Sequence, residues 1–282
     1  MKNCFICNHK STKIIYNEKI RDGSFGKFSK RKYSIKKCNK CNFAWLHPSI
    51  NIDYNKKEYR KKYNKTEKIN SYFIDHDYLQ NELISKIGIE KFRNKTVLDF
   101  GCGGGSFLDL ISNVSKKTYG IEPFKEYHKS LLKKGHEIFS DVNHLIKNKV
   151  KVDIILSFGV IEHVNNPALY IQQANKLLKK NGIFYIETDN FNDFLMQFNF
   201  LEFNSFYYRT AHKWYFNEQS LKILMKKNGF KKINVDFRHI HDLSNCFSWF
   251  KYKKPTSNSN IMQVNESLNL LWKKHLENIG QA

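Results

Sequence analysis

A short apolar strand that leads into a glycine-rich turn constrains this chain more than any other feature. Residues 97–105 read VLDFGCGGG, so that an acid, Asp99, lies near the end of the strand and four glycines follow within five positions. Glycine lets the backbone turn sharply and approach a ligand closely. The helix expected after the turn would offer unpaired N–H groups to that ligand. Dinucleotide-binding folds use a related turn, so the run alone does not identify the ligand.

The segments after this turn alternate between strand and helix patterns. Residues 117–122 form a short β-like run ending at Glu122, residues 137–141 form another ending at Asp141, and residues 152–158 read as a fully buried strand. A helix is expected over 167–180, ended by a C-cap at Asn181 and Gly182, and a fifth strand over 183–187. This alternation predicts an α/β fold with a doubly wound, mostly parallel sheet. Beyond it, we expect a helix over 220–228 and a late strand over 231–237.

Together these segments resemble the class I S-adenosylmethionine (SAM) methyltransferases over roughly residues 90–235. The resemblance rests on residues 98–105, on 120–123 and on 153–164, which includes the run Ile161-Glu162-His163-Val164. Another ligand on a nucleotide fold is the alternative, and a dinucleotide dehydrogenase fits the local pattern less well. The resemblance implies SAM as cofactor, with Glu122 accepting the ribose hydroxyls. The full set of expected cofactor-binding residues is Asp99, Gly101, Cys102, Gly103, Glu122, Pro123, Asp141, Ser157 and Phe158.

Four of the six cysteines form two Cys-x-x-Cys pairs, Cys4 with Cys7 and Cys38 with Cys41. In a reducing compartment such pairs indicate a structural zinc site rather than disulfides. Four thiolates supply tetrahedral coordination. We therefore expect structural Zn²⁺ here; a redox role is the alternative, although neither pair lies in a strand–helix context.

Two histidines are candidate catalytic bases, because imidazole titrates near neutral pH. His163 follows the fourth strand, where the methyl group of the cofactor is expected, and His212 lies in an aromatic-rich segment. His163 could instead orient its loop, or could join Glu162 in holding a divalent metal, as in the quinone-type O-methyltransferases that this segment also resembles. His212 follows Arg209, which together with it could meet a phosphate or hydroxyl group of the substrate.

The chain is expected to divide into three parts. Residues 1–62 would form the zinc-binding module, 63–250 the methyltransferase domain, and 251–282 a linker with a C-terminal amphipathic helix over 261–279. Residues 191–216 are rich in Phe and Tyr and are expected to form a substrate lid over the domain. The alternative is a hydrophobic cap packed on the sheet.

The formal net charge of +22 raises the question of nucleic-acid binding. Only six of the 48 basic residues are Arg, which is the better residue for bidentate phosphate contacts. Residues 1–62 nevertheless hold 17 Lys or Arg against four acids. A solvated Lys-rich face and a surface that attracts phosphorylated substrates both fit this distribution.

A four-cysteine module before a SAM fold resembles a group of bacterial methyltransferases that act on sugar nucleotides and other precursors of surface polysaccharides or natural products. We therefore expect a cytoplasmic enzyme that methylates a small, sugar-type or phosphorylated acceptor, without a membrane span and with an unknown oligomeric state. Alternatives are a ribosomal RNA methyltransferase with a zinc knuckle, and a zinc-bearing binding module whose SAM fold is vestigial. The intact Asp99, Gly101, Gly103 and Glu122 argue against the last of these.

Overall fold

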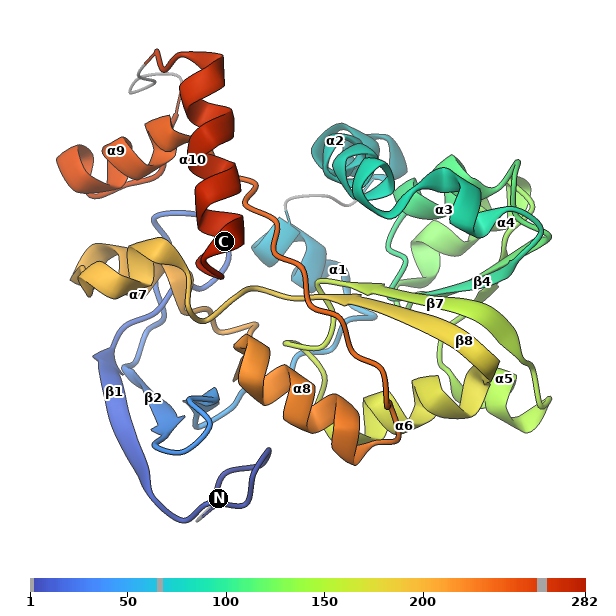
Figure 1. Ribbon diagram of the computed structural model, residues 1–282, viewed down its shortest axis with the longest axis horizontal. Helices are drawn as coiled ribbons and strands as arrows, with labels where there is room; N and C mark the ends of the chain where they lie inside the picture. Colours follow the sequence, from blue (N-terminus) through green and yellow to red (C-terminus); the bar gives the residue numbers. More distant parts are fainter. Residues whose placement is uncertain (1–2, 65–67, 258–262) are drawn as a thin grey trace. The chain divides into compact units, whose positions relative to one another are not determined.

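The computed structural model describes residues 3–64, 68–257 and 263–282, and contacts between residues divide the chain into two compact units (Figure 1). The first, which we call the parallel-sheet unit, is Asn51–Thr188. The second, the cysteine unit, combines Met1–Ile50 with Asp189–Ala282.

The parallel-sheet unit is built on five strands in the order β6-β5-β4-β7-β8, and every neighbouring pair is parallel. The central strand β4 is almost entirely buried, as expected for a parallel sheet with both faces covered. Because all five strands run the same way, their carboxyl ends meet at one edge of the sheet. The strands are β4 Thr96–Phe100, β5 Lys117–Ile121, β6 Glu137–Phe139, β7 Val152–Phe158 and β8 Leu178–Glu187.

Helices cover both faces of this sheet (Figure 1). On one face α2 (Ile69–Ile87), α3 (Ser106–Ile111) and α4 (His128–Lys133) bury apolar side chains such as Leu83 and Phe107 against the strands. On the other face lie α5 (Asn143–Lys147) and α6 (Pro167–Leu177). The short elements are α1 Lys57–Tyr59, η1 Arg60–Asn64, η2 Ile89–Phe92 and η3 Lys125–Tyr127. The predicted α/β fold with a parallel sheet is confirmed.

The cysteine unit contains a second, antiparallel sheet with the order β1-β2-β3-β9. Its strands are β1 Thr12–Glu18, β2 Tyr33–Cys38, β3 Ala44–His47 and β9 Trp214–Tyr215. The pairing of Trp45 with Trp214 joins segments that lie far apart in the sequence. Tyr16, Ile35 and Tyr215 contribute to one apolar cluster on this sheet.

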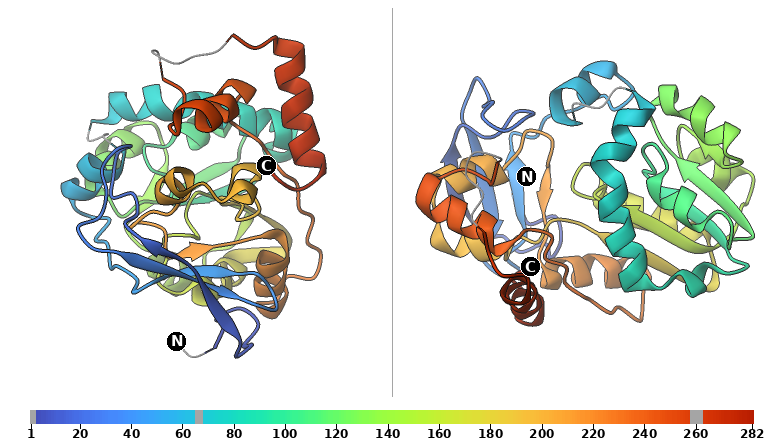
Figure 2. Two further views of the ribbon diagram at one scale, coloured as in Figure 1. Left: turned by 90° about the vertical axis from the view of Figure 1, so that its left-hand side faces the viewer. Right: turned by 90° about the horizontal axis from the view of Figure 1, so that it is seen from above.

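Three helices of the cysteine unit share a second apolar cluster, which includes Phe203 of α7, Trp249 of α9 and Trp272 of α10. Figure 2 shows α7 beside the twisted strands β1 and β2. The bounds of the three helices, with those of the remaining elements, are η4 Phe194–Phe198, α7 Leu201–Tyr207, α8 Glu218–Lys227, α9 Leu243–Tyr252 and α10 Glu266–Asn278. The aromatic side chains of residues 191–216 therefore pack within this unit.

The units differ from the expected division at 62/63 and 250/251. The reason is long-range pairing: β9 extends the sheet formed by the N-terminal strands, and the side chain of Asn217, which caps α8, donates to the carbonyl of Cys41. The cysteine pairs therefore belong to one compact unit with the segment after β8, rather than to a separate N-terminal module.

Two local expectations also differ from the structure. The helix expected to end at residue 180 ends at Leu177, and Asn181 and Gly182 lie inside β8. The strand expected over 231–237 is wrong, since these residues alternate in burial but no strand pairs with them in the described part of the chain. Residues 258–262 of the expected linker and C-terminal helix lie outside the described residues.

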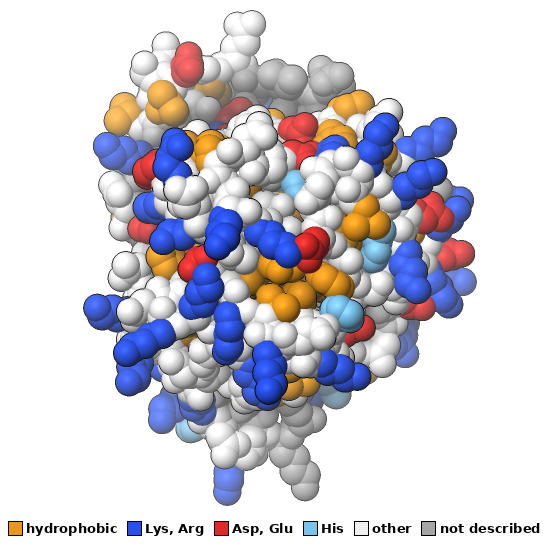
Figure 3. Space-filling model, turned by 90° about the vertical axis from the view of Figure 1, so that its right-hand side faces the viewer, with side chains coloured by type: hydrophobic (Ala, Val, Ile, Leu, Met, Phe, Trp, Pro, Cys, Tyr) orange, Lys and Arg blue, Asp and Glu red, His pale blue; other side chains and the backbone are white. Residues whose placement is uncertain are grey.

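Basic side chains are spread across the face shown in Figure 3, with acidic side chains set among them. Within the described ranges, no helix combines the length and apolar character that crossing a membrane requires.

Candidate functional site

The glycine-rich turn connects β4 to α3 and has the backbone geometry that only glycine adopts easily. Gly101 has φ of 100° and Gly105 has φ of 93°. A Cβ atom on Gly101 would lie 2.5 Å from Val160 Cγ2, and one on Gly105 would lie 2.3 Å from Leu131 Cδ2. Conformation and space therefore both disfavour larger residues at these positions.

Glu122 lies directly after β5, and its buried carboxylate reaches across to the turn. Oε2 accepts a hydrogen bond of 2.9 Å from the backbone N–H of Gly103, and Oε1 accepts one of 2.7 Å from Phe124 N–H. Arg60 Nη2 donates to the same Oε1 at 3.0 Å, and both side chains are almost fully buried. Burial lowers the pKa of Arg60, but the Glu122 carboxylate together with the nearby Tyr127, Tyr59 and Tyr72 more than reverses this, so the pKa is raised and the guanidinium stays charged.

Asp99 is the second buried acid at this edge of the sheet. Burial, and then the neighbouring Glu122 carboxylate, raise the pKa of Asp99 to about 7. Two carboxylates held close in a site of low polarity titrate differently, because one negative charge disfavours the other. Asp99 therefore exchanges a proton near neutral pH beside a carboxylate that an arginine neutralises.

The side chain of Tyr72, from α2, covers the turn. A Cβ atom on Gly103 would lie 2.5 Å from Tyr72 Oη, and one on Gly104 would lie 2.4 Å from Tyr72 Cδ1. Sequence reasoning missed both Tyr72 and Arg60, since neither lies in a recognisable motif. The one available signal was that Arg is rare in this Lys-rich chain, where six Arg stand among 48 basic residues.

The other expected cofactor residues lie near the carboxyl ends of the strands but differ in their burial and in their contacts. Phe158 packs against Phe107 of α3, with ring centroids 5.2 Å apart. Ser157 is fully buried, and its hydroxyl accepts a hydrogen bond of 2.7 Å from Tyr170 of α6, on the opposite face. Asp141 is exposed, and its carboxylate accepts from Asn143 N–H at 2.7 Å.

Two further expected residues flank these positions. Cys102 is buried, and burial keeps the pKa of its thiol well above the usual value, so it packs as a small apolar residue. Pro123 is half-buried beside Glu122.

The first candidate base, His163, follows β7 in the parallel-sheet unit. Its Nε2 lies 3.8 Å from Glu162 Oε1, and the other oxygen of Glu162 accepts a hydrogen bond of 2.9 Å from the Thr188 hydroxyl. Tyr54 approaches the imidazole edge-on, with ring centroids 5.8 Å apart. The Glu162 carboxylate, held by the Thr188 hydroxyl, thus lies beside the imidazole of His163.

The second candidate, His212, belongs to the cysteine unit. It is buried, and its Nδ1 lies 3.4 Å from Asp189 Oδ2. Its backbone N–H donates to the carbonyl of Arg209 at 3.1 Å, which fixes the turn before β9.

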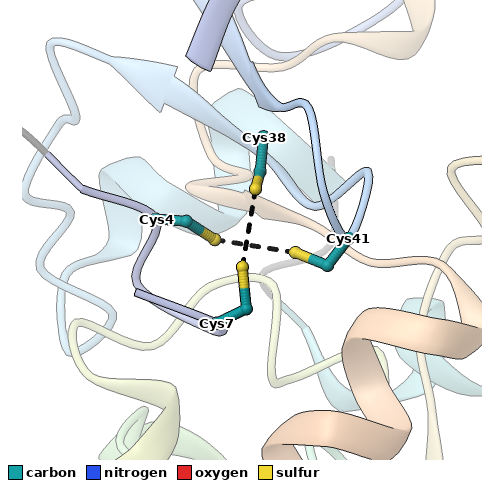
Figure 4. Close-up of side chains that lie close together, drawn as sticks. All are labelled: Cys4, Cys7, Cys38 and Cys41. Atoms are coloured by element: carbon teal, nitrogen blue, oxygen red, sulfur yellow. Dashed lines mark hydrogen bonds between the residues drawn. The ribbon is translucent and has the colours of Figure 1, made fainter. Parts of the chain in front are cut away.

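The four cysteines of the expected metal site converge, as Figure 4 shows. The Sγ atoms all lie within 4.8 Å of one another, with Cys4 and Cys41 3.6 Å apart and Cys7 and Cys38 3.5 Å apart. Zn–S bonds of about 2.3 Å in a tetrahedron place sulfur atoms about 3.8 Å apart. All four cysteines are free of disulfides. The donor set and its spacing therefore fit a tetrahedral metal ion.

The two cysteine pairs also repeat the same backbone geometry. Asn8 N–H donates to the Cys4 carbonyl at 2.9 Å, and Asn42 N–H donates to the Cys38 carbonyl at 3.1 Å. Asn8 and Asn42 both have positive φ, 60° and 56°. Each cysteine pair is thus presented by a turn of matching shape. The hydrogen bond between the Cys4 and Cys41 thiols lowers the pKa of Cys4 to about 5 and raises that of Cys41.

Comparison with curated proteins finds ubiquinone biosynthesis O-methyltransferases. The chain is 33% identical to that of Pelagibacter ubique over 125 residues, which cover 40% of this chain and 51% of the relative. It is 25% identical to the mitochondrial enzyme of Rattus norvegicus over 197 residues, which cover 64% of this chain and 55% of the relative. The match thus spans about half the length of these relatives.

These relatives correct the expected acceptor. They are named for quinone biosynthesis, so the expectation of a sugar-type or phosphorylated acceptor in surface-polysaccharide or natural-product biosynthesis is wrong. The alternative of a ribosomal RNA methyltransferase is rejected on the same ground. The resemblance to a methyltransferase is confirmed, while the sugar-specific subgroup is not.

Among solved structures, a SAM-dependent methyltransferase from Archaeoglobus fulgidus matches with a TM-score of 0.49 and 21% identity, over 72% of this chain and 86% of that one. The model of the family described as "Methyltransferase domain" matches residues 72–235, more than half of the chain. The vestigial-fold alternative loses its basis, because the predicted SAM-dependent methyltransferase is confirmed at the level of the domain. The chain therefore belongs to this methyltransferase family and carries a class I SAM-dependent methyltransferase domain.

Proposed function

We propose that this protein transfers a methyl group from SAM to a ring hydroxyl of a quinone precursor. The names of the curated relatives support this choice of acceptor and of oxygen as the methylated atom. The observation that carries the cofactor assignment is Glu122, a buried carboxylate bound to the backbone of Gly103 where two parallel strands end.

SAM supplies the electrophilic methyl group, and the residues of this chain bind and align it. In our proposal Glu122 accepts hydrogen bonds from the ribose hydroxyls, and the turn from Gly101 to Gly105 lies against the cofactor. Asp99, Pro123 and Phe158 line the same edge. Asp141 and Ser157 remain proposals with weaker geometric support, since Asp141 is exposed and Tyr170 binds the Ser157 hydroxyl.

We assign His163 as the base that removes the proton of the acceptor hydroxyl. Glu162 lies 3.8 Å from its Nε2 and would stabilise the imidazolium that results. His163→Asn should lower kcat by about 10²–10⁴-fold, the usual contribution of a general base, and leave the affinity for S-adenosylhomocysteine (SAH) within about twofold. A His212→Asn variant, measured alongside, separates the two candidates: an equal loss of kcat there would transfer the role to His212.

We further propose that Cys4, Cys7, Cys38 and Cys41 bind one structural Zn²⁺. The matched turns and the spacing of the sulfur atoms support it. The ion would hold the N-terminal turns onto α8, whose Lys227 Nζ donates to the Ile6 carbonyl at 2.7 Å.

The cofactor assignment is tested by calorimetric titration with SAH. Glu122→Ala removes charge-assisted hydrogen bonds of about 1.5–3 kcal/mol each, so we expect the Kd to rise by at least about tenfold. Glu126→Ala is the matched control, because this nearby carboxylate is half-exposed and pairs with Lys57 at 2.8 Å. Equal affinities of the two variants would contradict the assignment.

A further inference from the structure

Cys7 differs from the other cysteines of the chain in its exposure. All six cysteines lie in the described ranges and carry no disulfide, and five of them are buried. Cys38 and Cys41 are fully buried and Cys4 is 2% exposed, whereas Cys7 is only half-buried. Access from solvent is one of two conditions that make a cysteine open to oxidation. A small oxidant in solution therefore meets the sulfur cluster first at Cys7.

The second condition is a thiolate, and the proposed metal site would supply it. Cysteines bind zinc as thiolates, so a Cys7 that ligates the ion is held in its nucleophilic form. A second sulfur lies beside it, because Cys38 Sγ is 3.5 Å from Cys7 Sγ. Cys4 and Cys41, whose Sγ atoms are 3.6 Å apart, form another pair of this kind. We call these the crossed pairs, because each joins one Cys-x-x-Cys turn to the other.

Both turns are also fixed by contacts that do not involve a metal. Phe5, in the first turn, stacks on Trp214 with ring centroids 5.3 Å apart, and the Ile6 carbonyl accepts from Lys227 Nζ at 2.7 Å. In the second turn the carbonyl of Cys41 accepts from the side-chain amide of α8's capping residue at 3.2 Å. The sulfur atoms of the two turns therefore stay close to one another when metal ligation is lost.

We propose that Cys7 is a peroxide-sensitive modification site, with Cys38 as the sulfur that resolves it. The inference rests on the proposed zinc site and adds a reaction to it. Cys7 Sγ attacks hydrogen peroxide, the O–O bond breaks, and the sulfur becomes a sulfenic acid while hydroxide leaves and is protonated to water. Cys38 Sγ then attacks the Cys7 sulfur, and the S–O bond breaks to release a second water. Two thiols and one peroxide thus give one disulfide and two waters.

The consequence is loss of the ion without separation of the two turns. The disulfide removes two of the four ligands that a structural zinc site needs. Cys4 and Cys41 can then form the second crossed disulfide with another molecule of peroxide. Because both crossed pairs join the N-terminal turn to the turn after β2, the oxidised unit keeps the connection that the ion would provide.

The test titrates hydrogen peroxide into the full-length, zinc-loaded protein. Released zinc is measured with a chromogenic chelator, and disulfides are located by mass spectrometry of peptides prepared without reductant. We expect the disulfide between Cys7 and Cys38 first, with one zinc released for each, and the other crossed disulfide at higher peroxide. Cys102 and Cys246 are internal controls, because both are buried and should remain thiols.

Two matched variants test the order of events. Cys7→His replaces the exposed sulfur with another zinc ligand, and Cys41→His does the same at a buried position. Peroxide should release zinc at least about tenfold more slowly from Cys7→His, but within about twofold of the wild-type rate from Cys41→His. A third variant, Cys38→Ser, does not depend on retained zinc: dimedone, which traps sulfenic acids, should label Cys7 in it.

Disulfides within the Cys-x-x-Cys pairs in place of the crossed ones would overturn the proposal, as would first oxidation at a buried cysteine or equal rates in the two His variants. Zinc-loaded protein whose thiols survive peroxide would refute the inference and leave the zinc site standing. Protein that cannot be loaded with zinc would refute the zinc site instead, and with it the reaction proposed here.

Discussion

The buried pair of Arg60 and Glu122 gives the sharpest energetic prediction. The side chains are only 9% and 4% exposed, and the atoms Nη2 and Oε1 are 3.0 Å apart. At an effective dielectric constant of about 20, unit charges at such a separation attract by roughly 5–6 kcal/mol. Removing one partner of a buried pair typically costs about 3–5 kcal/mol, because the other charge is left in a site of low polarity.

We therefore expect Arg60→Met and Glu122→Gln each to lower the free energy of unfolding by about 3–5 kcal/mol. The double variant should be far more stable than the sum of the two losses predicts, since replacing both charges removes the uncompensated group. A coupling energy of about 2–4 kcal/mol should result. The assay is a double-mutant cycle by urea unfolding at pH 7, followed by circular dichroism.

The same cycle reports on the cofactor. The Glu122 carboxylate already accepts three hydrogen bonds, from Gly103, Phe124 and Arg60, and has about four lone-pair positions. Two ribose hydroxyls would have to displace at least one of these donors. Arg60 is the donor that can move most easily, because it donates from a side chain, whereas Gly103 and Phe124 donate from the backbone. Saturating SAH should therefore shrink the coupling energy. Losses that add to within about 0.5 kcal/mol without ligand would refute the reasoning.

Three further predictions address separate parts of the molecule. Cys38→Ser with Cys41→Ser should remove near-stoichiometric zinc, measured by elemental analysis, and destabilise the cysteine unit; full zinc content in this variant would exclude the proposed ligands. Folding favours the protonated form of the Asp99 carboxyl, whose pKa is raised to about 7. Its contribution to the free energy of unfolding is therefore complete below about pH 4 and is lost as the pH rises towards 7. Asp99→Asn should therefore flatten the dependence of unfolding free energy on pH between about 4 and 7, by a few kcal/mol, and an unchanged slope would count against the raised pKa. Gly101→Ala would place a side chain on a residue with φ of 100°, with its Cβ only 2.5 Å from Val160 Cγ2. We therefore expect it to lower the free energy of unfolding by about 1–3 kcal/mol or more, measured by thermal unfolding. A neutral effect would show that the turn relaxes.

The sequence predicted the elements whose signals are local. The apolar strand with its acid and glycines, the acids that follow β5 and β6, and the two Cys-x-x-Cys turns are each readable within a few residues. The parallel sheet followed from their order. Glu122 could be singled out because its place after a short strand has a direct chemical meaning.

Features that depend on distant contacts could not be predicted in this way. Arg60 meets Glu122 across 62 positions, and β9 pairs with β3 across an interval that no periodicity marks. At residues 231–237 the sequence predicted an element that does not form. The alternating pattern there resembles a strand, but no partner strand is present in the described part of the chain. Arginine scarcity is a signal that could have been used, because Arg60 is buried and Arg21 and Arg209 are half-buried.

The central claim is methyl transfer from SAM to a ring hydroxyl, and the most direct measurement follows the methyl group itself. Purified protein is incubated with SAM carrying a CD₃ group and with 3,4-dihydroxybenzoate or catechol, and the products are examined by mass spectrometry and NMR. The account predicts a CD₃ group on oxygen, SAH formed in equal amount, and loss of both products in Glu122→Ala. A label on ring carbon, or SAH formation that does not depend on the acceptor, would contradict it.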